Sequence, residues 1–134
     1  MAKFFVWTLL ISLLQFSCQQ KRTDDCFDVT KYVLIHTDPK TKTETYRHSG
    51  NNQCQYFKMY WPNGTLLSTY FTINGKIEGV TNSYNSINGK IMLQMHYVNG
   101  QLDGTLIRYK ENGEIKDCDE YKKGRIIGNN CPPE

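Results

Sequence analysis

The sequence predicts an all-β protein, an elongated single-layer antiparallel meander of stacked β-hairpins. Three observations carry this prediction. Asn-Gly pairs recur along the chain, a unit that begins near a tyrosine repeats three times, and an aliphatic residue stands two places after each turn glycine. An Asn-Gly pair between alternating apolar residues is the strongest short-range hairpin signal, and a fixed period outweighs any single-residue argument about the fold.

The repeats occupy residues 56–79, 80–104 and 105–128 of a single β domain predicted over residues 31–134. Successive units are 25 and 24 residues apart, measured between their first glycines and again between their last. Lys123-Gly124 takes the place of a sixth Asn-Gly pair. A type I′ turn needs positive φ at both central residues, which glycine accepts at no steric cost. The predicted turn and repeat glycines are Gly64, Gly75, Gly79, Gly89, Gly100, Gly104, Gly113, Gly124 and Gly128.

The aliphatic residues two places beyond the turn glycines define one side of the predicted sheet. Side chains alternate between the two faces of a strand, so these residues share a face. In the middle unit His96 is expected to point to the opposite face. Before the clear repeats, residues 32–37 and 43–47 predict a further hairpin that caps the row, since terminal units of repeat proteins are atypical. The shared-face residues are Leu66, Ile77, Ile91, Leu102, Ile115 and Ile126.

Residues 55–128 resemble the MORN repeat family in its short bacterial form, Tyr-x-x-Asn-Gly-x-Leu followed by Tyr-x-x-Gly-x-Leu-x-Gly. The resemblance implies an extended sheet of stacked hairpins and a non-catalytic interaction module, and many bacterial members are antitoxin-like or immunity-like. Thr72 departs from the pattern because it stands where the later units have Tyr97 and Tyr121, so we expect it at a less buried end of the stack. The motif residues in the three units are Tyr60 with Asn63-Gly64, Tyr84 with Asn88-Gly89, and Tyr109 with Asn112-Gly113.

Residues 1–17 predict a bacterial signal peptide. Lys3 supplies a positive start, and the apolar run at 4–14 is too short to cross a bilayer as a helix. Ser17-Cys18 resembles a lipobox, which makes Cys18 the predicted lipidation site and leaves residues 18–30 as a flexible tether. Cleavage near Ser17 by ordinary signal peptidase, or an uncleaved anchor, are the alternatives. The expected location is the bacterial cell envelope, with the protein lipid-anchored at the outer membrane or periplasmic face, or exposed at the surface.

Four cysteines follow Cys18, and an even number of cysteines in an exported chain of this size indicates disulfides. Their spacing leaves all three connectivities open, and we favour local pairing that staples the two ends. A zinc site is disfavoured because there is no Cys-x-x-Cys pair and no histidine at ligand spacing. The disulfide candidates are Cys26, Cys54, Cys118 and Cys131.

The chain carries no recognised catalytic or phosphate-binding motif, so no enzyme activity, cofactor or metal is predicted. After residue 17 the net charge is only +2, with 15 Lys and Arg against 13 Asp and Glu, so nucleic acid is not an expected partner. Asp117 and Asp119 share a strand face and could form an acid–base pair or a calcium site. We favour the interpretation that this face of the last hairpin is simply open to water.

Aromatic residues are the remaining functional signal, with nine Tyr, six Phe and two Trp. Exposed aromatic side chains on a single-layer sheet mark interaction surfaces. The sequence therefore predicts a lipid-anchored, protein- or glycan-binding repeat module with a protein as its most expected partner. The alternative is an antitoxin or immunity protein that neutralises a partner toxin. The candidate binding residues are Trp61, Tyr70, Phe71 and His96.

Overall fold

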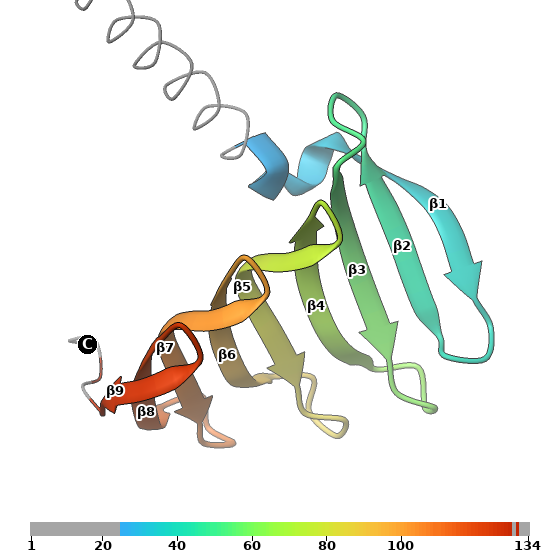
Figure 1. The fold of residues 1–134 in the computed structure, drawn as a ribbon. Helices are drawn as coiled ribbons and strands as arrows, with labels where there is room; N and C mark the ends of the chain where they lie inside the picture. Colours follow the sequence, from blue (N-terminus) through green and yellow to red (C-terminus); the bar gives the residue numbers. More distant parts are fainter. Residues whose placement is uncertain (1–24, 130, 132–134) are drawn as a thin grey trace, which may run out of the picture.

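A computed structural model describes residues 25–129 and 131 of the chain. Its nine strands form one open sheet whose spatial order follows the order of the chain, and every neighbouring pair is antiparallel (Figure 1). The predicted all-β, single-layer meander is therefore confirmed. The predicted signal peptide and the lipidation site Cys18 lie outside the described residues.

Two short 3-10 turns precede the strands: η1 (Asp25–Phe27) and η2 (Val29–Lys31). The strands are β1 (Tyr32–Asp38), β2 (Thr43–His48), β3 (Cys54–Tyr60), β4 (Leu66–Ile73), β5 (Lys76–Tyr84), β6 (Ile91–Val98), β7 (Gln101–Tyr109), β8 (Ile115–Lys122) and β9 (Arg125–Gly128).

The flexible tether predicted at residues 18–30 is wrong for its described part, residues 25–30. These residues form η1 and most of η2 and lie against the sheet. Cys26 is only 1% exposed and is disulfide-bonded to Cys54 at the start of β3, and Asp28 caps η2 by accepting a hydrogen bond of 3.1 Å from the Thr30 N–H. The polar sequence concealed this order because the contacts that hold the segment, which include the disulfide and the Phe27 ring, join it to residues far along the chain.

The turns are of two kinds. Asn74-Gly75, Asn99-Gly100 and Lys123-Gly124 have positive φ at both residues, as a type I′ turn requires. Elsewhere the type I′ prediction is wrong, because only the glycine is left-handed at Gly64, Gly89 and Gly113. These turns contain more residues. In the first of them the Trp61 N–H donates to the Thr65 carbonyl at 2.8 Å, with Pro62 inside the turn, where its ring fixes φ at a negative value.

Eight of the nine predicted glycines have positive φ, Gly128 being the exception. Two of the eight do not sit in turns but inside strands, where they mark bends. Between β4 and β5, the step from Thr69 to Phe71 is matched by the longer step from Asn82 to Glu78, which contains Gly79. The same bulge recurs around Gly104 in β7. The extra residues bend β5 and β7, which Figure 1 shows as arrows that change direction.

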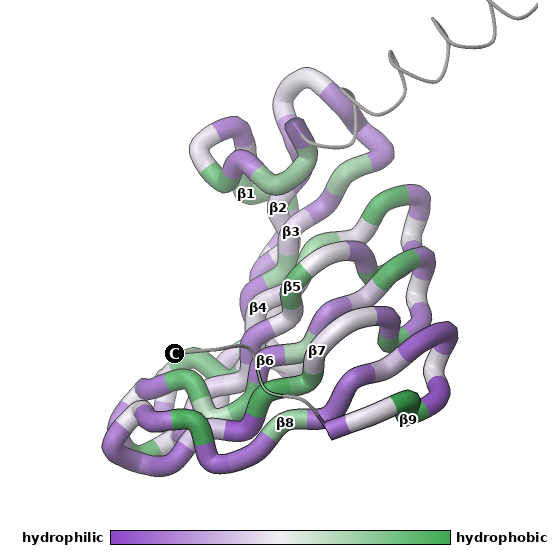
Figure 2. The backbone as a smooth tube through the Cα atoms, turned by 90° about the vertical axis from the view of Figure 1, so that its left-hand side faces the viewer, coloured by the Kyte–Doolittle hydropathy of each residue, from purple (hydrophilic) through white to green (hydrophobic). Residues whose placement is uncertain are grey.

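The sheet has almost no conventional core. The buried hydrophobic residues are Cys26, Cys54, Leu106, Ile107 and Cys118. Hydrophilic and hydrophobic residues alternate along the chain, as Figure 2 shows, in place of a separate apolar layer. Most strand residues are half-buried because each packs against its cross-strand neighbours.

Thr72 corrects one expectation drawn from the repeat pattern. It is 6% exposed and does not mark an exposed end of the stack. The reason is topological: β4 is an interior strand, and Thr72 pairs with Gln55 of β3 on one side and Ile77 of β5 on the other. The exposed first edge of the sheet is β1, three strands earlier.

Candidate binding surface

The predicted binding residues do not form one surface. Phe71 and Tyr70 are adjacent on β4 and point to opposite faces. The Tyr70 ring stacks on Phe57 with centroids 4.8 Å apart, while the Phe71 ring stacks on Tyr56 at 4.6 Å. Phe71 is further covered by Phe27 of η1, with ring centroids 5.5 Å apart. We call the side that carries Phe71 the η1 face.

An aromatic cluster on the η1 face holds the N-terminal segment. Tyr32 packs edge-on against both Tyr56 and Phe71, and its hydroxyl donates to the Cys26 carbonyl at 2.6 Å. Burial, and secondarily the charge of Asp25, raises the pKa of Tyr32 to about 12. The phenol is therefore neutral at physiological pH and acts as a hydrogen-bond donor. This part of the face is internal packing and not an open binding surface.

The packing of Phe27 depends on Gly79. A Cβ atom at that position would lie 2.6 Å from Phe27 Cε1, closer than any real contact. Sequence reasoning assigned Gly79 to the repeat pattern but missed Phe27. Its place next to Cys26, a predicted disulfide cysteine, is the signal that could have identified it as part of the fold.

A groove of about 490 Å³ continues the η1 face beyond this covered part, across β5, β6 and β7. Val80, one of the residues that line the groove, directly follows Gly79, the glycine that Phe27 covers. Val80 and Val98 are 40% and 42% exposed, and Gln94 is held by a 3.0 Å hydrogen bond from its Nε2 to Asn82 Oδ1. The lining residues are Val80, Gln94, Met95, His96, Val98, Asp103, Gly104, Thr105 and Ile107.

His96, predicted as a binding residue, lies in this groove. Its Nδ1 is 2.6 Å from the Asp103 carbonyl oxygen, and because a carbonyl only accepts, Nδ1 carries the proton. The ring lies so close to Gly104 that a Cβ there would be 3.1 Å from His96 Nδ1. The same interaction fixes the ring and leaves Nε2 as an acceptor in the neutral imidazole. The carboxylate of Asp103, which lines the groove, is engaged by Lys122, whose Nζ donates to Asp103 Oδ1 at 2.8 Å.

Phe71 and His96 are one repeat apart, as are Gly79 and Gly104. In the first unit the ring of Phe27 lies over the glycine. In the second unit the three atoms nearest to a Cβ at Gly104 all belong to His96 of the neighbouring strand, and the groove opens beside this side chain. The two glycines are thus covered in different ways, Gly79 by a ring of the N-terminal segment and Gly104 by a side chain of the adjacent strand, beside which the groove remains.

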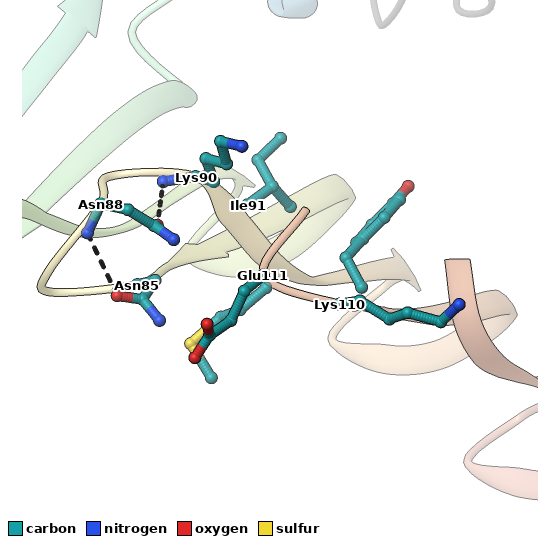
Figure 3. A pocket seen from close by; sticks show the side chains of 8 residues that line it. Asn85, Asn88, Lys90, Ile91, Lys110 and Glu111 are labelled. Atoms are coloured by element: carbon teal, nitrogen blue, oxygen red, sulfur yellow. Dashed lines mark hydrogen bonds between the residues drawn. The ribbon is translucent and has the colours of Figure 1, made fainter. Parts of the chain in front are cut away.

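A smaller pocket of about 140 Å³ lies between the turns that follow β5 and β7 (Figure 3). The first turn is held by its own side chains, with Asn85 Oδ1 accepting from the Asn88 N–H at 3.3 Å and Asn88 Oδ1 accepting from the Lys90 N–H at 2.9 Å. Met92, which lines the pocket, is 46% exposed. The lining residues are Asn85, Asn88, Lys90, Ile91, Met92, Tyr109, Lys110 and Glu111.

Trp61, the fourth predicted binding residue, fills the gap between the preceding pair of turns. Its indole Nε1 donates to the Tyr84 carbonyl at 3.3 Å. Asn63 Nδ2 and Thr65 Oγ1 both donate to the Ser86 carbonyl, at 3.0 and 3.2 Å. Trp61 is half-buried and ties two hairpins together.

Other polar clusters have structural partners. Glu44 Oε2 accepts from the hydroxyls of Tyr46 and Tyr60, each at 2.7 Å, and these bonds lower the pKa of the carboxyl. Asp117 and Asp119, considered as an acid–base pair or a calcium site, are both bonded to Arg108 Nη1, at 2.6 and 2.9 Å. Both carboxylates are thereby paired with the same guanidinium.

The disulfides join Cys26 to Cys54 and Cys118 to Cys131, so the favoured local pairing is the one present. In the residues that the structure describes, no three His, Cys, Asp or Glu side chains gather as a metal site would require. Along the same part of the chain, no helix has the length and apolar character needed to cross a membrane.

No protein-family model matches the chain, and no curated protein matches it in sequence. The solved structures similar to the chain include the crystal structure of TarM and that of an S. aureus TarM mutant in complex with fondaparinux, α-GlcNAc-glycerol and UDP. Each is 13% identical with a TM-score of 0.46, and the match covers 84% of this chain and 24% of TarM. The chain therefore spans about a quarter of those proteins, and a likeness of this degree carries no functional argument.

Proposed function

We propose that the protein is a non-catalytic binding module of the MORN-like repeat type, in which the groove on the η1 face receives a protein or glycan partner. The observation that supports this proposal is the contrast between two copies of one surface. In the first copy Phe27 of η1 packs over Gly79, whereas in the second the His96 side chain packs over Gly104 and a groove lined by both residues remains. A concave surface with an apolar rim and a few fixed polar groups is what a binding site requires.

The groove offers apolar contact and directed hydrogen bonds together. Val80 and Val98 supply exposed apolar area, and His96 and Gln94 are held in place by bonds to Asp103 and Asn82. Side chains already fixed by neighbours lose little freedom when a ligand binds, so such a surface binds at a low entropic cost.

The test is capture of envelope proteins and glycans by the immobilised protein and by two charge variants. Val80→Asp combined with Val98→Asp places carboxylates on the groove rim. Val33→Asp, at an exposed valine of β1 that is 60% exposed, is the matched control. We expect a partner retained by the wild type and the control to be lost from the groove variant. Equal retention by all three proteins would contradict the proposal.

We further propose that Cys18 carries a lipid that anchors the module in the bacterial envelope. A small residue followed by cysteine at the end of the apolar run supports this proposal, and two or more acyl chains anchor a protein stably. Cys18→Ala is expected to move the protein from the membrane pellet to the supernatant. Retention of the variant in the pellet after carbonate washing would refute lipid anchoring.

A further inference from the structure

The pocket of Figure 3 and the gap that holds Trp61 are successive copies of one feature. Trp61 is the first residue after the Tyr60 that ends β3, and Asn85 and Lys110 follow Tyr84 and Tyr109 in the same way. The first gap lies between the Trp61 turn and the Asn85 turn. The pocket lies one repeat later, between the Asn85 turn and the Lys110 turn.

An indole fills the first gap, and the corresponding side chain at the second is the much smaller Asn85. Asn85 does not reach across, because its Oδ1 accepts from the N–H groups of Ile87 and Asn88 within its own turn, at 2.8 and 3.3 Å. The Tyr109 carbonyl occupies the repeat position of the Tyr84 carbonyl, which accepts from the Trp61 indole at 3.3 Å. The second gap therefore has the same flanking turns and the corresponding carbonyl, but no indole ring fills it.

The size of the pocket agrees with this correspondence. Its volume is about 140 Å³, and an engineered apolar cavity of about 150 Å³ binds benzene. Ile91, Met92 and Tyr109 supply apolar parts of the lining, and Lys90 and Glu111 supply charged ones. The pocket continues the row of turn-to-turn contacts that Trp61 begins.

We propose that this pocket binds one aromatic ring, an indole above all, presented as a tryptophan side chain by a protein partner. The partner's ring takes the place between the Asn85 and Lys110 turns that Trp61 takes between the preceding turns. The inference rests on the proposed binding function and deepens it, because it selects a protein over a glycan and gives that partner an aromatic anchor, the residue type that dominates protein interfaces.

The test is titration of the full-length protein with indole and with N-acetyltryptophanamide, followed by backbone amide NMR shifts. Saturable shifts are expected at Asn85, Lys90 and Lys110, with a dissociation constant of about 1 mM, as fits so small a ligand. Met92→Asp should abolish them by placing a charge in the pocket wall. Ile35→Asp, at a residue of similar exposure in β1, should leave them unchanged.

A second variant tests the repeat correspondence. Trp61→Ala should open the first gap, so that indole produces a new set of shifts at Thr65 and Ser86 and raises the melting temperature of this variant more than that of the wild type. Absence of saturable shifts in the folded wild type overturns the inference. So do shifts at the pocket with N-acetylglucosamine but not with indole.

The two proposals fail differently. A protein partner captured equally by the wild type and Met92→Asp overturns the aromatic anchor and leaves the proposed binding function standing. If indole binds saturably but neither the groove variant nor the pocket variant reduces partner capture, the result counts against the proposed function alone.

Discussion

Gly79 and Gly89 are required for different structural reasons, and the sequence alone does not distinguish these reasons. Both have positive φ, +76° and +68°. Nothing lies within 4 Å of a Cβ at Gly89, whereas a Cβ at Gly79 would meet the Phe27 ring at 2.6 Å. Gly89 is required only because of its backbone conformation, whereas Gly79 is required also because the Phe27 ring lies against it.

Substitution of each by alanine measures the difference. Gly89→Ala should cost about 1–2 kcal/mol of unfolding free energy, the cost of a left-handed residue with a side chain. Gly79→Ala should cost more because Phe27 must move. Adding Phe27→Ala should remove the steric part, so that the two substitutions are non-additive in a double-mutant cycle from denaturant unfolding. Equal costs at the two glycines would contradict the packing of Phe27.

Glu44 predicts an acid-sensitive contribution to stability. Its pKa is lowered from 4.5, first by the hydrogen bond from Tyr46 and then by that from Tyr60. A carboxyl with a depressed folded pKa stabilises the fold above its unfolded pKa, and this contribution is lost as the pH falls through the folded value. Glu44→Gln should lose about 1–2 kcal/mol at pH 7 and flatten the decline below pH 4.5.

The same cluster predicts an alkaline limit. Burial, then the bond to Glu44, raises the pKa of Tyr46 from 10.0 to about 12. A raised pKa contributes stability that is complete below the unfolded value and disappears as the pH rises through the folded one. Thermal unfolding of the wild type and Glu44→Gln from pH 3 to pH 12 measures both limits, and Glu111→Gln, at an exposed carboxylate, is the control. Parallel pH profiles for all three proteins would rule out the cluster as their source.

At the scale of the element, the disulfides at the two ends do different work. The Cys26–Cys54 bond closes 28 residues and the Cys118–Cys131 bond closes 13. Chain entropy alone gives similar stabilisation, about 3.5 and about 3 kcal/mol. The first bond also holds η1 over the aromatic cluster, and Cys118 instead pairs β8 with a residue beyond β9.

Removal of each bond by paired Cys→Ser substitutions should therefore give unlike results. Loss of Cys26–Cys54 should uncover the cluster around Phe71 and increase binding of a hydrophobic dye to the still-folded sheet. Loss of Cys118–Cys131 should lower the melting temperature with little change in dye binding. The measurements are dye fluorescence at a temperature below both transitions and calorimetry. Matching dye binding in the two variants would mean that η1 keeps its place without its disulfide.

The sequence predicted the strands well because their signals are local. Each clear hairpin carries its own turn glycine and aliphatic residue, and these place the strands from β3 to β9. Local signals did not distinguish the two turn types, since Asn88-Gly89 and Asn99-Gly100 look alike in sequence. The packing of Phe27 on Gly79 escaped prediction because it joins residues far apart in the chain. So did the groove, which exists only where three strands meet.

At the scale of the whole molecule, stability should decrease towards the edges of the sheet. In a repeat array each strand is supported by its immediate neighbours. The strand β9 has four residues and one neighbour, and Ile126 and Ile127 are 62% and 64% exposed. Native-state hydrogen exchange should find the least protection in β9 and the most in β5 to β7. Uniform protection across the sheet would mean that it unfolds as one cooperative unit.

The open, sequentially ordered sheet is the claim from which the groove, the pocket and the two binding proposals made for them follow. Cross-strand NOEs between backbone protons test it most directly. The account predicts NOEs between each strand and the next along the chain, from β1–β2 to β8–β9, including the Gln94–Ile107 and Asn82–Gln94 pairs. Backbone NOEs between β1 and β9, which would close the sheet, or between strands that are not consecutive, would contradict it.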